Sequence, residues 1–302
     1  MTRDRILAWA ALAATLLIWA SFLVSTRAAV ATALGPVEIG LMRFAPAALL
    51  FAPVLVRRGP IPAGATWRDA TVFALCGGVA FVFLLASGMR FAPVADAGVF
   101  APAMLPLWVA LIARFALGER VGGLRAAGLA LIVAGALAVG GWAAMTEGAP
   151  GAWRGHVLFA CASFNWAIYT IAFRRSRLAA LPAAAMLAFW AAAGFLVLAA
   201  LLGTHFAAVP LRTVVIQTLL QGVLSGFVAT YTFFYAIERL GAGRTATFAA
   251  VVPILAALGA WAFLGEPLDA AKGVGVAITA IGVALASRPG REPVRENPAH
   301  HR

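Results

Sequence analysis

Apolar stretches long enough to cross a membrane recur along the whole chain. A helix needs about 20 mostly apolar residues to cross a hydrocarbon core of about 30 Å, and such stretches follow one another with short polar connections between them. Because the connections are short, the pattern leaves no room for a soluble catalytic domain. The stretches predict ten transmembrane helices, at 6–28, 36–56, 68–90, 93–117, 121–142, 153–174, 182–203, 212–238, 243–264 and 268–286.

Composition points to the same class of protein. Hydrophobic residues make up 63% of the chain and charged residues 11%, whereas a soluble domain has about 45–50% and about 25%. The predicted fold class is therefore an all-α membrane protein. The first stretch follows Arg3 and Arg5, as the core of a signal peptide would. It is longer than the roughly 7–15 residues of a signal core, so we expect it to be retained as the first helix.

The chain also repeats itself at a fixed offset of 147 residues. Each half holds five predicted helices, and an odd number means that the second half enters the membrane from the opposite side. We therefore predict two inverted five-helix repeats around a central cavity, related by a pseudo-two-fold axis in the membrane plane. The first repeat is expected at 1–144 and the second at 145–287, followed by a disordered cytoplasmic tail at 288–302. Coinciding positions include Trp19 with Trp166, Pro106 with Pro253, and Leu-Gly-Glu at 117–119 with Leu-Gly-Glu at 264–266.

The basic residues lie mainly on one side of the predicted helices. The formal net charge is +12, but its placement argues against a nucleic-acid partner. With the N-terminus in the cytoplasm, seventeen of the 23 Lys and Arg residues fall on the cytoplasmic side, five fall outside, and Arg43 lies within a span. Cytoplasmic connections of membrane proteins carry such an excess. We expect a multi-pass protein of a bacterial inner (plasma) membrane, with both termini in the cytoplasm.

The repeated motifs resemble a known family. They read PLWVALIARFALGERVGGLRAAGLALIVAG at 106–135 and PILAALGAWAFLGEPLDAAKGVGVAITAIG at 253–282, and an Arg-Phe pair stands at 43–44 in the second span. This doubled set resembles the EamA domain, the repeat unit of the drug/metabolite transporter (DMT) superfamily. The resemblance covers about 1–287 and implies alternating access around a central cavity, commonly with outward movement of small metabolites. The layout is similar to that of the aromatic amino-acid exporters.

Glycines in these motifs have a predicted structural role. Gly118 and Gly265 are expected to end long helices in a backbone conformation that glycine adopts readily. Glu119 and Glu266 are then expected at the start of the next helix, whose partial positive charge favours a carboxylate. Other glycines recur at helical spacing and predict faces of small residues where two helices approach closely. These glycines are Gly128 and Gly135, Gly275 and Gly282, and Gly222 and Gly226.

Two prolines interrupt apolar helices at matched positions. Pro106 and Pro253 each free a carbonyl one turn back, and such a carbonyl needs a partner or a wet cavity. Matched interruptions in the two halves point to a transport site, so both prolines are candidate hinges. A kink between packed helices, without a role in transport, is the alternative.

Polar and aromatic side chains at membrane depth are the candidate substrate-binding residues. Polar groups there are costly and commonly functional. Arg43 is interpreted either as a ligand of a substrate carboxylate or as an Arg that reaches outward to Glu38 or to a neighbouring helix end. The amide and aromatic candidates either contact substrate or bridge helices, and Tyr235 is close enough to a helix end to belong to an interfacial belt. The candidates are Trp19, Arg43, Phe100, Asn165, Trp166, Tyr169, Gln221, Tyr231 and Tyr235.

Acidic residues are missing from the predicted middle of the membrane. The first span has no carboxylate, unlike that of the small multidrug-resistance branch of the superfamily, which exchanges protons for cationic drugs. We therefore expect either a facilitator or an exchanger with a shallow proton site such as Asp96 or Glu238. A cavity of aromatic, amide and Arg groups favours amino acids or related small organic acids as substrates.

These observations predict an exporter of small metabolites that works by alternating access. Uptake by the same fold is one alternative, and a membrane-embedded enzyme is another, but the four His residues lie near the outer surface or in the tail and no HExxH, GxSxG or P-loop pattern is present. Cys76 and Cys161 are interpreted as packing residues. We expect no catalytic residues, no cofactor and no metal. The partners we expect are a small-molecule substrate and the lipid bilayer, with the chain as a monomer.

Overall fold

The computed structural model describes residues 3–118, 121–146 and 151–287, and every regular element within them is a helix. The predicted tail at 288–302 and Glu119 lie outside these residues. The first half contains α1 (Arg3–Val30), α2 (Pro36–Leu50), α3 (Ala52–Arg58), α4 (Trp67–Val72), η1 (Phe73–Val79), α5 (Ala80–Gly88), α6 (Val94–Gly98), η2 (Val99–Ala103), α7 (Leu105–Leu117) and α8 (Gly123–Thr146). The second half contains α9 (Ala152–Ser176), α10 (Ala180–Leu202), η3 (Phe206–Ala208), α11 (Leu211–Thr218), η4 (Leu219–Val228), α12 (Ala229–Leu240), α13 (Ala242–Ala249), α14 (Val252–Leu264) and α15 (Ala270–Ala286).

The described helices agree closely with the predicted spans. Eight are long and apolar enough to cross a membrane, and there are nine if the bent pair α2 and α3 is counted as one span. The tenth predicted span corresponds to α15, a shorter apolar helix of 17 residues. The protein is therefore a multi-pass, all-helical membrane protein, and the count of ten spans stays a prediction.

The second predicted span, 36–56, is not one straight helix. Its two parts, α2 and α3, meet at an angle of 61°. Pro53 lies at the second position of α3, where its ring removes a backbone N–H and crowds the carbonyl one turn back. The hydrophobic pattern continues through this point, which explains why apolarity alone predicted a single helix.

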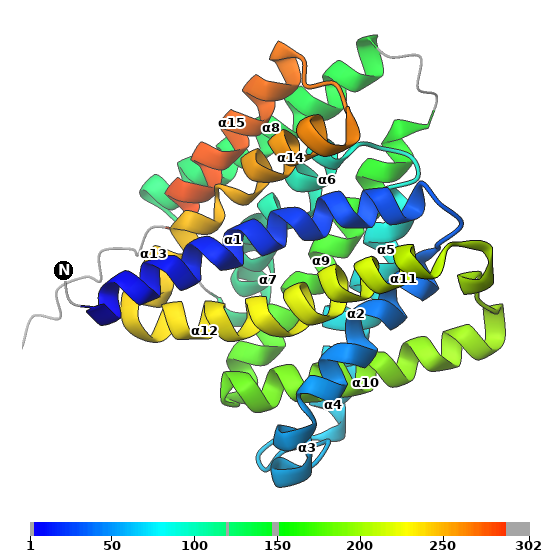
Figure 1. The fold of residues 1–302 in the computed structure, drawn as a ribbon. Coiled ribbons are helices and arrows are strands. Elements are labelled where there is room, and N and C mark those ends of the chain that lie inside the picture. The colour runs from blue at the N-terminus through cyan, green and yellow to red at the C-terminus, as the bar shows by residue number, and fades with distance from the viewer. Residues whose placement is uncertain (1–2, 119–120, 147–150, 288–302) are drawn as a thin grey trace, which may run out of the picture.

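Helix neighbours recur in matched pairs between the two halves. α1 runs beside α12, and α9, the repeat counterpart of α1, runs beside α5 (Figure 1). In the same way α1 packs on α14 while α9 packs on α7. These exchanges are those that a two-fold relation between the halves would require. The inverted arrangement itself stays a prediction.

One close approach between the halves is the crossing of α8 and α15. A methyl group added at Gly128 would lie 2.7 Å from the carbonyl oxygen of Gly282, and one added at Gly282 would lie 2.7 Å from that of Gly128. Gly135 and Gly275 oppose each other in the same way, at 2.8 and 3.3 Å. The predicted small-residue faces of these two helices are confirmed.

Two π-helical segments also fall at matched positions. η1 spans Phe73–Val79, and a shift of 147 residues places it within η4, Leu219–Val228. A π-helix widens the helical turn, and such segments occur often at functional sites. In this protein both segments contribute to the cavity described below.

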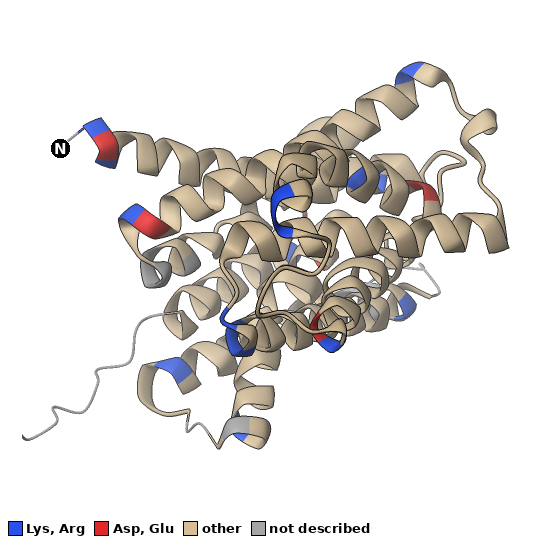
Figure 2. Cartoon of the chain, turned by 90° about the horizontal axis from the view of Figure 1, so that it is seen from below, with Lys and Arg blue, Asp and Glu red and all other residues tan. Residues whose placement is uncertain are grey.

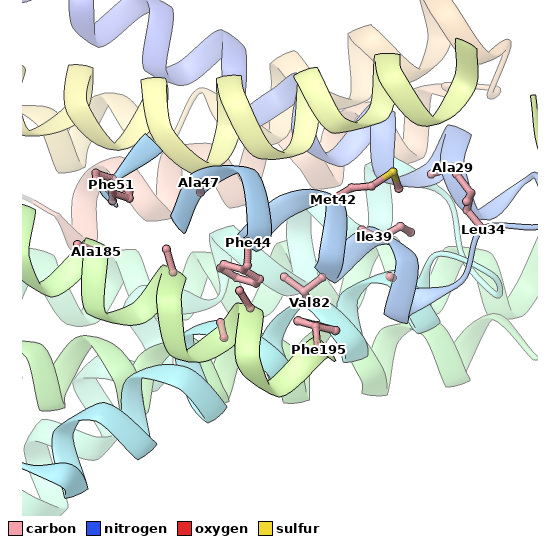
Figure 3. Close-up of a cluster of buried hydrophobic side chains, with 14 residues drawn as sticks. Ala29, Leu34, Ile39, Met42, Phe44, Ala47, Phe51, Val82, Ala185 and Phe195 are labelled. Atoms are coloured by element: carbon pink, nitrogen blue, oxygen red, sulfur yellow. The ribbon is translucent and has the colours of Figure 1, made fainter. Parts of the chain in front are cut away.

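A buried cluster joins α2 to α10. Phe44 and Phe195 stack with ring centres 5.9 Å apart, and Ile39, Met42 and Val82 surround them (Figure 3). This packing holds α2 against the second half of the chain. It fixes the helix that carries Arg43.

Charged residues lie mainly at helix ends and in connections, and the middles of most helices are uncharged (Figure 2). Gly118 and Gly265 end α7 and α14 with φ of 69° and 67°, as predicted. The expectation that Glu266 begins the next helix is wrong. The residue that caps α15 is Asp269. The side chain of Glu266 instead contacts residues of the first half.

Candidate functional site

A central cavity lies between the two halves. It has two compartments, of about 240 and 120 Å³, which share Trp19, Arg43 and Trp166. Together they are comparable with the smaller small-molecule sites, of about 300 Å³. The remaining walls of the larger compartment are Phe44, Ala47, Gly77, Tyr169, Phe173, Ala184, Leu187, Ala188, Ser225, Gly226, Thr230, Phe233 and Phe234. Those of the smaller one are Phe22, Leu23, Phe81, Ala101, Pro102, Leu105, Ser163 and Val252.

Arg43 is the charged residue of the cavity wall. Its side chain is buried, and Nη1 donates a hydrogen bond to Oγ of Ser225 at 2.8 Å. The guanidinium carbon lies 4.1 Å from the centre of the Phe22 ring and 5.7 Å from that of Phe44. Among the described residues, no carboxylate lies within 4.0 Å of this guanidinium. The buried positive charge is held by aromatic faces and a hydroxyl, and no described residue supplies a counter-ion.

The interpretation in which Arg43 reaches out to Glu38 does not describe this structure. Glu38 caps its own helix, because Oε2 accepts from the backbone N–H of Gly35 at 2.8 Å. Its Oε1 accepts from the backbone N–H of His205 at 2.6 Å and lies 3.2 Å from Nδ1 of the same residue. Glu38 is thereby engaged away from the cavity, and Arg43 faces inward.

Two glycines of η4 place Ser225 against Arg43. A methyl group on Gly226 would lie 3.0 Å from the carbonyl oxygen of Arg43, and one on Gly222 would meet the backbone at Met42. The backbones of α2 and η4 therefore come into direct contact, as the spacing of these glycines predicted. This close approach allows the short side chain of Ser225 to reach the guanidinium.

Aromatic rings form a large part of the remaining wall. Trp19 contacts Phe233, with ring centres 4.8 Å apart. On the opposite side Trp166 lies 4.6 Å from Phe81 and 5.2 Å from Tyr169. Trp166, Tyr169 and Phe173 are spaced by three and four residues on α9, which directs all three towards one side of the helix. The cavity therefore offers flat apolar faces around one cation.

Four of the nine predicted binding residues line the cavity: Trp19, Arg43, Trp166 and Tyr169. Whether they bind substrate stays a prediction. Two further candidates lie elsewhere on the same bundle. Phe100 stacks on the His156 ring at 4.6 Å with an interplanar angle of 8°. Asn165 donates from Nδ2 to the carbonyl oxygen of Cys161, one turn back on its own helix, at 2.9 Å.

Gln221 lies behind the cavity, in the contact between η4 and α1. Its Nε2 donates to Oγ of Ser25 and to Oγ1 of Thr26, both at 3.1 Å. Gln217, one turn earlier, donates to the carbonyl oxygen of Ser25 at 3.1 Å. The amide therefore bridges two helices, which was the second interpretation of its polarity.

The two candidate tyrosines of α12 point away from the cavity. Tyr231 is 57% exposed on the outside of the bundle. Tyr235 lies beneath the Arg239 guanidinium, at 3.7 Å from the ring centre, and packs against the start of α1. Their positions at helical spacing are as expected, but the neighbouring residues Thr230, Phe233 and Phe234 occupy the cavity face.

Pro106 and Pro253 each lie at the second residue of a helix, α7 and α14. Each span is therefore broken two to three residues before its proline, at Met104 and at Ala250–Val251. A proline at the start of a helix costs no backbone bond that the helix would have made. Both breaks are confirmed, and a role as hinges stays a prediction.

Sequence reasoning missed most of the aromatic wall and Ser225. The signals were present but not specific, because phenylalanines are abundant in every span. Phe44 was noted as part of an Arg-Phe pair, and Ser225 stands between the two packing glycines of η4. The π-helical segments, which place Gly77 and Ser225 in the wall, leave no mark that the hydrophobic pattern could show.

The end of the bundle opposite the N-terminus is closed by contacts between distant segments. We call it the distal end, where α1 ends at Val30 and α14 ends at Leu264. Nε of Arg27 lies 2.8 Å from Oε1 of Glu266, and Nη1 of Arg27 donates to the carbonyl oxygen of Met89. Oε2 of Glu266 accepts from the backbone N–H of Val94 at 2.8 Å. Glu266 therefore caps α6, a helix of the other half.

A second distal contact joins α6 to α9. Oδ2 of Asp96 lies 2.7 Å from Nε2 of His156. Asp96 is fully buried, and its Oδ1 has no hydrogen-bond partner in the part of the chain that the structure describes. Glu238, the other candidate proton site, has a side chain that is 73% exposed beside Arg239. The two acidic candidates therefore lie in very different environments.

Metal and thiol chemistry receive no support from the described part of the chain. No group of three His, Cys, Asp or Glu residues there is arranged to hold a metal ion. Cys76 and Cys161 are both free thiols. The chemistry of the described cavity is that of binding: one guanidinium, a few hydroxyls and aromatic faces.

The fold and cavity define a multi-pass α-helical membrane transporter. The sequence model of the EamA-like transporter family matches the chain twice, at residues 6–141 and 153–288. The chain therefore belongs to the EamA-like transporter family of the DMT superfamily. The two matches are separated by the same 147 residues as the repeat.

Two individual proteins illustrate the relationship. A WAT1-related chloroplast protein of Arabidopsis thaliana is 34% identical over 133 residues, which is 43% of this chain and 31% of that protein. The chain thus matches about a third of the length of this curated relative. A crystal structure described only as that of a protein has 22% sequence identity and a TM-score of 0.61, over 92% of this chain and 96% of that one. This likeness shows the fold.

Proposed function

We propose that the protein exports amino acids or related small organic acids across a bacterial inner membrane by alternating access. The observation that carries this proposal is Arg43, a buried cation at the cavity wall with no carboxylate of the described residues beside it. A buried charge is costly unless it is paired. A guanidinium offers five N–H donors in a planar fork that matches a carboxylate, and the hydrogen bond to Ser225 uses one nitrogen. A substrate carboxylate would complete the pair.

The aromatic walls support a substrate with an apolar or aromatic side chain. Trp19 and Trp166 line both compartments together with Arg43. Aromatic pairs gain about 0.5–1.5 kcal/mol beyond the burial of their area. If the carboxylate of a substrate binds Arg43, the side chain of that substrate lies between these walls. This arrangement favours aromatic amino acids among the candidates. Outward movement as the net direction is proposed from the likeness to metabolite exporters.

The position of the cavity supports access from the end where the chain begins. Phe173 lies three residues before the end of α9, and Ala184 lies four residues after the start of α10. At a rise of about 1.5 Å per residue, the cavity comes within about 5 Å of those helix ends. The distal end, in contrast, is closed by Arg27, Glu266, Asp96 and Glu38. With the N-terminus in the cytoplasm, as the charge distribution favours, this is an inward-facing arrangement.

A transport screen tests the proposal. The purified chain is reconstituted in liposomes loaded with each of the twenty amino acids or with small organic acids, and efflux is measured. We expect efflux of a subset that carries a carboxylate, with aromatic amino acids leading, and competition by that same subset. Efflux of amines without a carboxylate, or of no compound in the set, would contradict the proposed substrate class. Accumulation against a gradient in right-side-out vesicles would favour uptake.

A second experiment locates the path of the substrate. Single cysteines replace Trp166, Tyr169 or Tyr231 in a Cys76→Ala, Cys161→Ala background. We expect substrate to slow labelling at 166 and 169, which line the cavity, and to leave labelling at 231 unchanged, because Tyr231 faces outward. Equal protection at all three positions would place the substrate elsewhere.

A further inference from the structure

The contact between Asp96 and His156 has an unusual hydrogen-bonding state. Glu266 and Glu38, the two other carboxylates that close the distal end, have partners on both oxygens. Among the described residues, Asp96 has one side-chain partner, Nε2 of His156 at 2.7 Å, and its second oxygen is unpaired in a fully buried site. An ionised carboxylate accepts hydrogen bonds only. A buried one with an unpaired oxygen is costly, and that cost falls when the group or its partner gains a proton.

The surroundings of the pair keep it apolar and connect it to water on one side. The His156 ring lies flat on Phe100, and Gly140 of α8 covers the stack so closely that an added methyl group would lie 3.2 Å from the Phe100 ring. Side-chain exposure is 11% for His156 and 0% for Asp96. Protons therefore have a route from the distal surface to Asp96 through the imidazole ring, the side chain that ordinarily titrates between about pH 5 and 8.

Other charged groups around α6 are already engaged. Arg27 of α1 pairs with Glu266, Arg154 of α9 lies over the Phe91 ring at 5.9 Å, and α14 carries no titratable residue. From α15 come Lys272, which is buried and has its own partners, and Asp269, which accepts the backbone N–H of Lys272. Asp96 and His156 are thus the two groups of this contact that face each other and are joined by a hydrogen bond.

The same two helices lead from the pair to the cavity. Ala101 follows Asp96 by five residues and Ser163 follows His156 by seven, distances of about 8 and 11 Å along a helix. Oγ of Ser163 donates to the carbonyl oxygen of Ala101 at 2.6 Å, and both residues line the smaller compartment. On its other side α6 packs on α14 at the helix break, where a methyl group on Gly98 would lie 3.2 Å from Cα of Pro253. A shift of α6 would therefore move residues at the cavity and at the break before α14.

We propose that the Asp96–His156 pair is a proton-binding site that controls opening of the distal end, an inference that rests on the proposed transport function for its role in the cycle. With one proton bound, the pair is a carboxylate and an imidazolium with no net charge. When the proton leaves to water, the pair carries one buried negative charge. The charged pair disfavours the closed contact between α6 and α9, so opening accompanies proton release.

Hydrogen–deuterium exchange tests the site without any substrate. The full chain in lipid nanodiscs is compared between about pH 5.5 and 8, the range in which histidine titrates, after correction for the intrinsic pH dependence of exchange. We expect exchange at 92–103 and 153–163 to rise with pH in the wild type. For a single proton, the ratio of open to closed forms changes by up to about tenfold per pH unit. A flat wild-type profile would overturn the proposal.

Two variants separate the site from a merely structural contact. Asp96→Asn removes the negative charge, so exchange no longer rises with pH. His156→Gln keeps a hydrogen-bond donor but leaves Asp96 to carry its charge, so exchange is high throughout this range. Glu238→Gln, at the exposed candidate, keeps the wild-type profile. A wild-type pH dependence in either variant that folds would overturn the proposal, and so would its loss in Glu238→Gln.

Proton movement during transport is the second readout. Liposomes that contain a pH-sensitive dye and the best amino-acid probe from the screen are examined for pH change during efflux. We expect a change with the wild type and none with Asp96→Asn, and probe efflux without any pH change in the wild type would refute coupling. If no amino acid moves but exchange follows the pattern above, the proposed substrate is wrong and the proton site stands.

Discussion

At the scale of single residues, Arg43 shows what the sequence could reveal and what it could not. Its charge in an apolar span made it a candidate at once, because such groups are rare. The same reasoning selected Gln221 and Asn165, which bond to their own bundle and not to the cavity. A polar side chain in the middle of a span needs a hydrogen-bonding partner, but the rotation of the helix about its axis determines which group becomes that partner. That rotation is set by packing contacts that lie far apart in the chain.

Replacement of Arg43 separates its charge from its shape. Arg43→Gln should weaken the apparent affinity for acids or zwitterions at least about tenfold, because a charge-assisted hydrogen bond contributes about 1.5–3 kcal/mol. Arg43→Lys should give an intermediate value, since an ammonium group does not form the two-pronged contact. The measurement is the concentration dependence of efflux from liposomes.

Arg239→Gln is the matched control, because Arg239 lies outside the cavity over Tyr235. It should leave the affinity unchanged. A collapse of folded yield in Arg43→Gln, in place of weaker binding, would show that Arg43 holds the helices together and does not bind substrate.

At the scale of elements, the sequence predicted positions well and geometry poorly. The ends of α7 and α14 follow from Gly118 and Gly265, and the breaks follow from the prolines. The bend between α2 and α3 and the π-helical segments η1 and η4 did not follow, because both keep the hydrophobic pattern intact. Both features depend on which carbonyl oxygen accepts the hydrogen bond of each backbone N–H. A hydrophobic pattern indicates which residues are buried, but it does not indicate which carbonyl accepts.

The crossing of α8 and α15 makes a prediction about stability. Gly135→Val places a branched side chain where a methyl group would already lie 2.8 Å from the carbonyl oxygen of Gly275. Overpacking of this kind costs about 1–3 kcal/mol, so thermal stability in detergent should fall. Gly273→Ala is the control. Gly273 lies on α15, one of the two crossing helices, and its added methyl group would have no neighbour within 4 Å. Equal melting temperatures for the two variants would contradict the tight crossing.

The cap that Glu266 of the second half provides for α6 of the first half makes another prediction about stability. Glu266→Ala removes an acceptor from the Val94 N–H and the partner of Arg27, with an expected loss of about 1 kcal/mol because the contact is partly exposed. Exchange of the Val94 amide should rise, and the distal end should open more often. Glu238→Ala, an exposed carboxylate, should change neither. Unchanged exchange at Val94 in Glu266→Ala would refute the cap.

At the scale of the whole molecule, the charge bias and the five-helix halves make a topological prediction. Ten spans with both termini in the cytoplasm place the basic end of α9 at 174–177, just before the connection to α10, in the cytoplasm. A reporter that is active only outside the cytoplasm should be inactive when fused there or at the C-terminus. It should be active when fused near His205. Strong activity at 174–177 would invert the proposed orientation.

The glycine crossing also constrains how such a chain can change over time. Gly128 contacts Gly282, which is the repeat counterpart of Gly135, and Gly135 contacts Gly275, which is the repeat counterpart of Gly128. A larger residue in one half requires a compensating change at a site nearly half a chain away. The two halves are therefore bound to drift together at this seam. Elsewhere, as at Arg43 and its counterpart Trp190, each half was free to specialise, and that freedom gives a symmetric scaffold an asymmetric site.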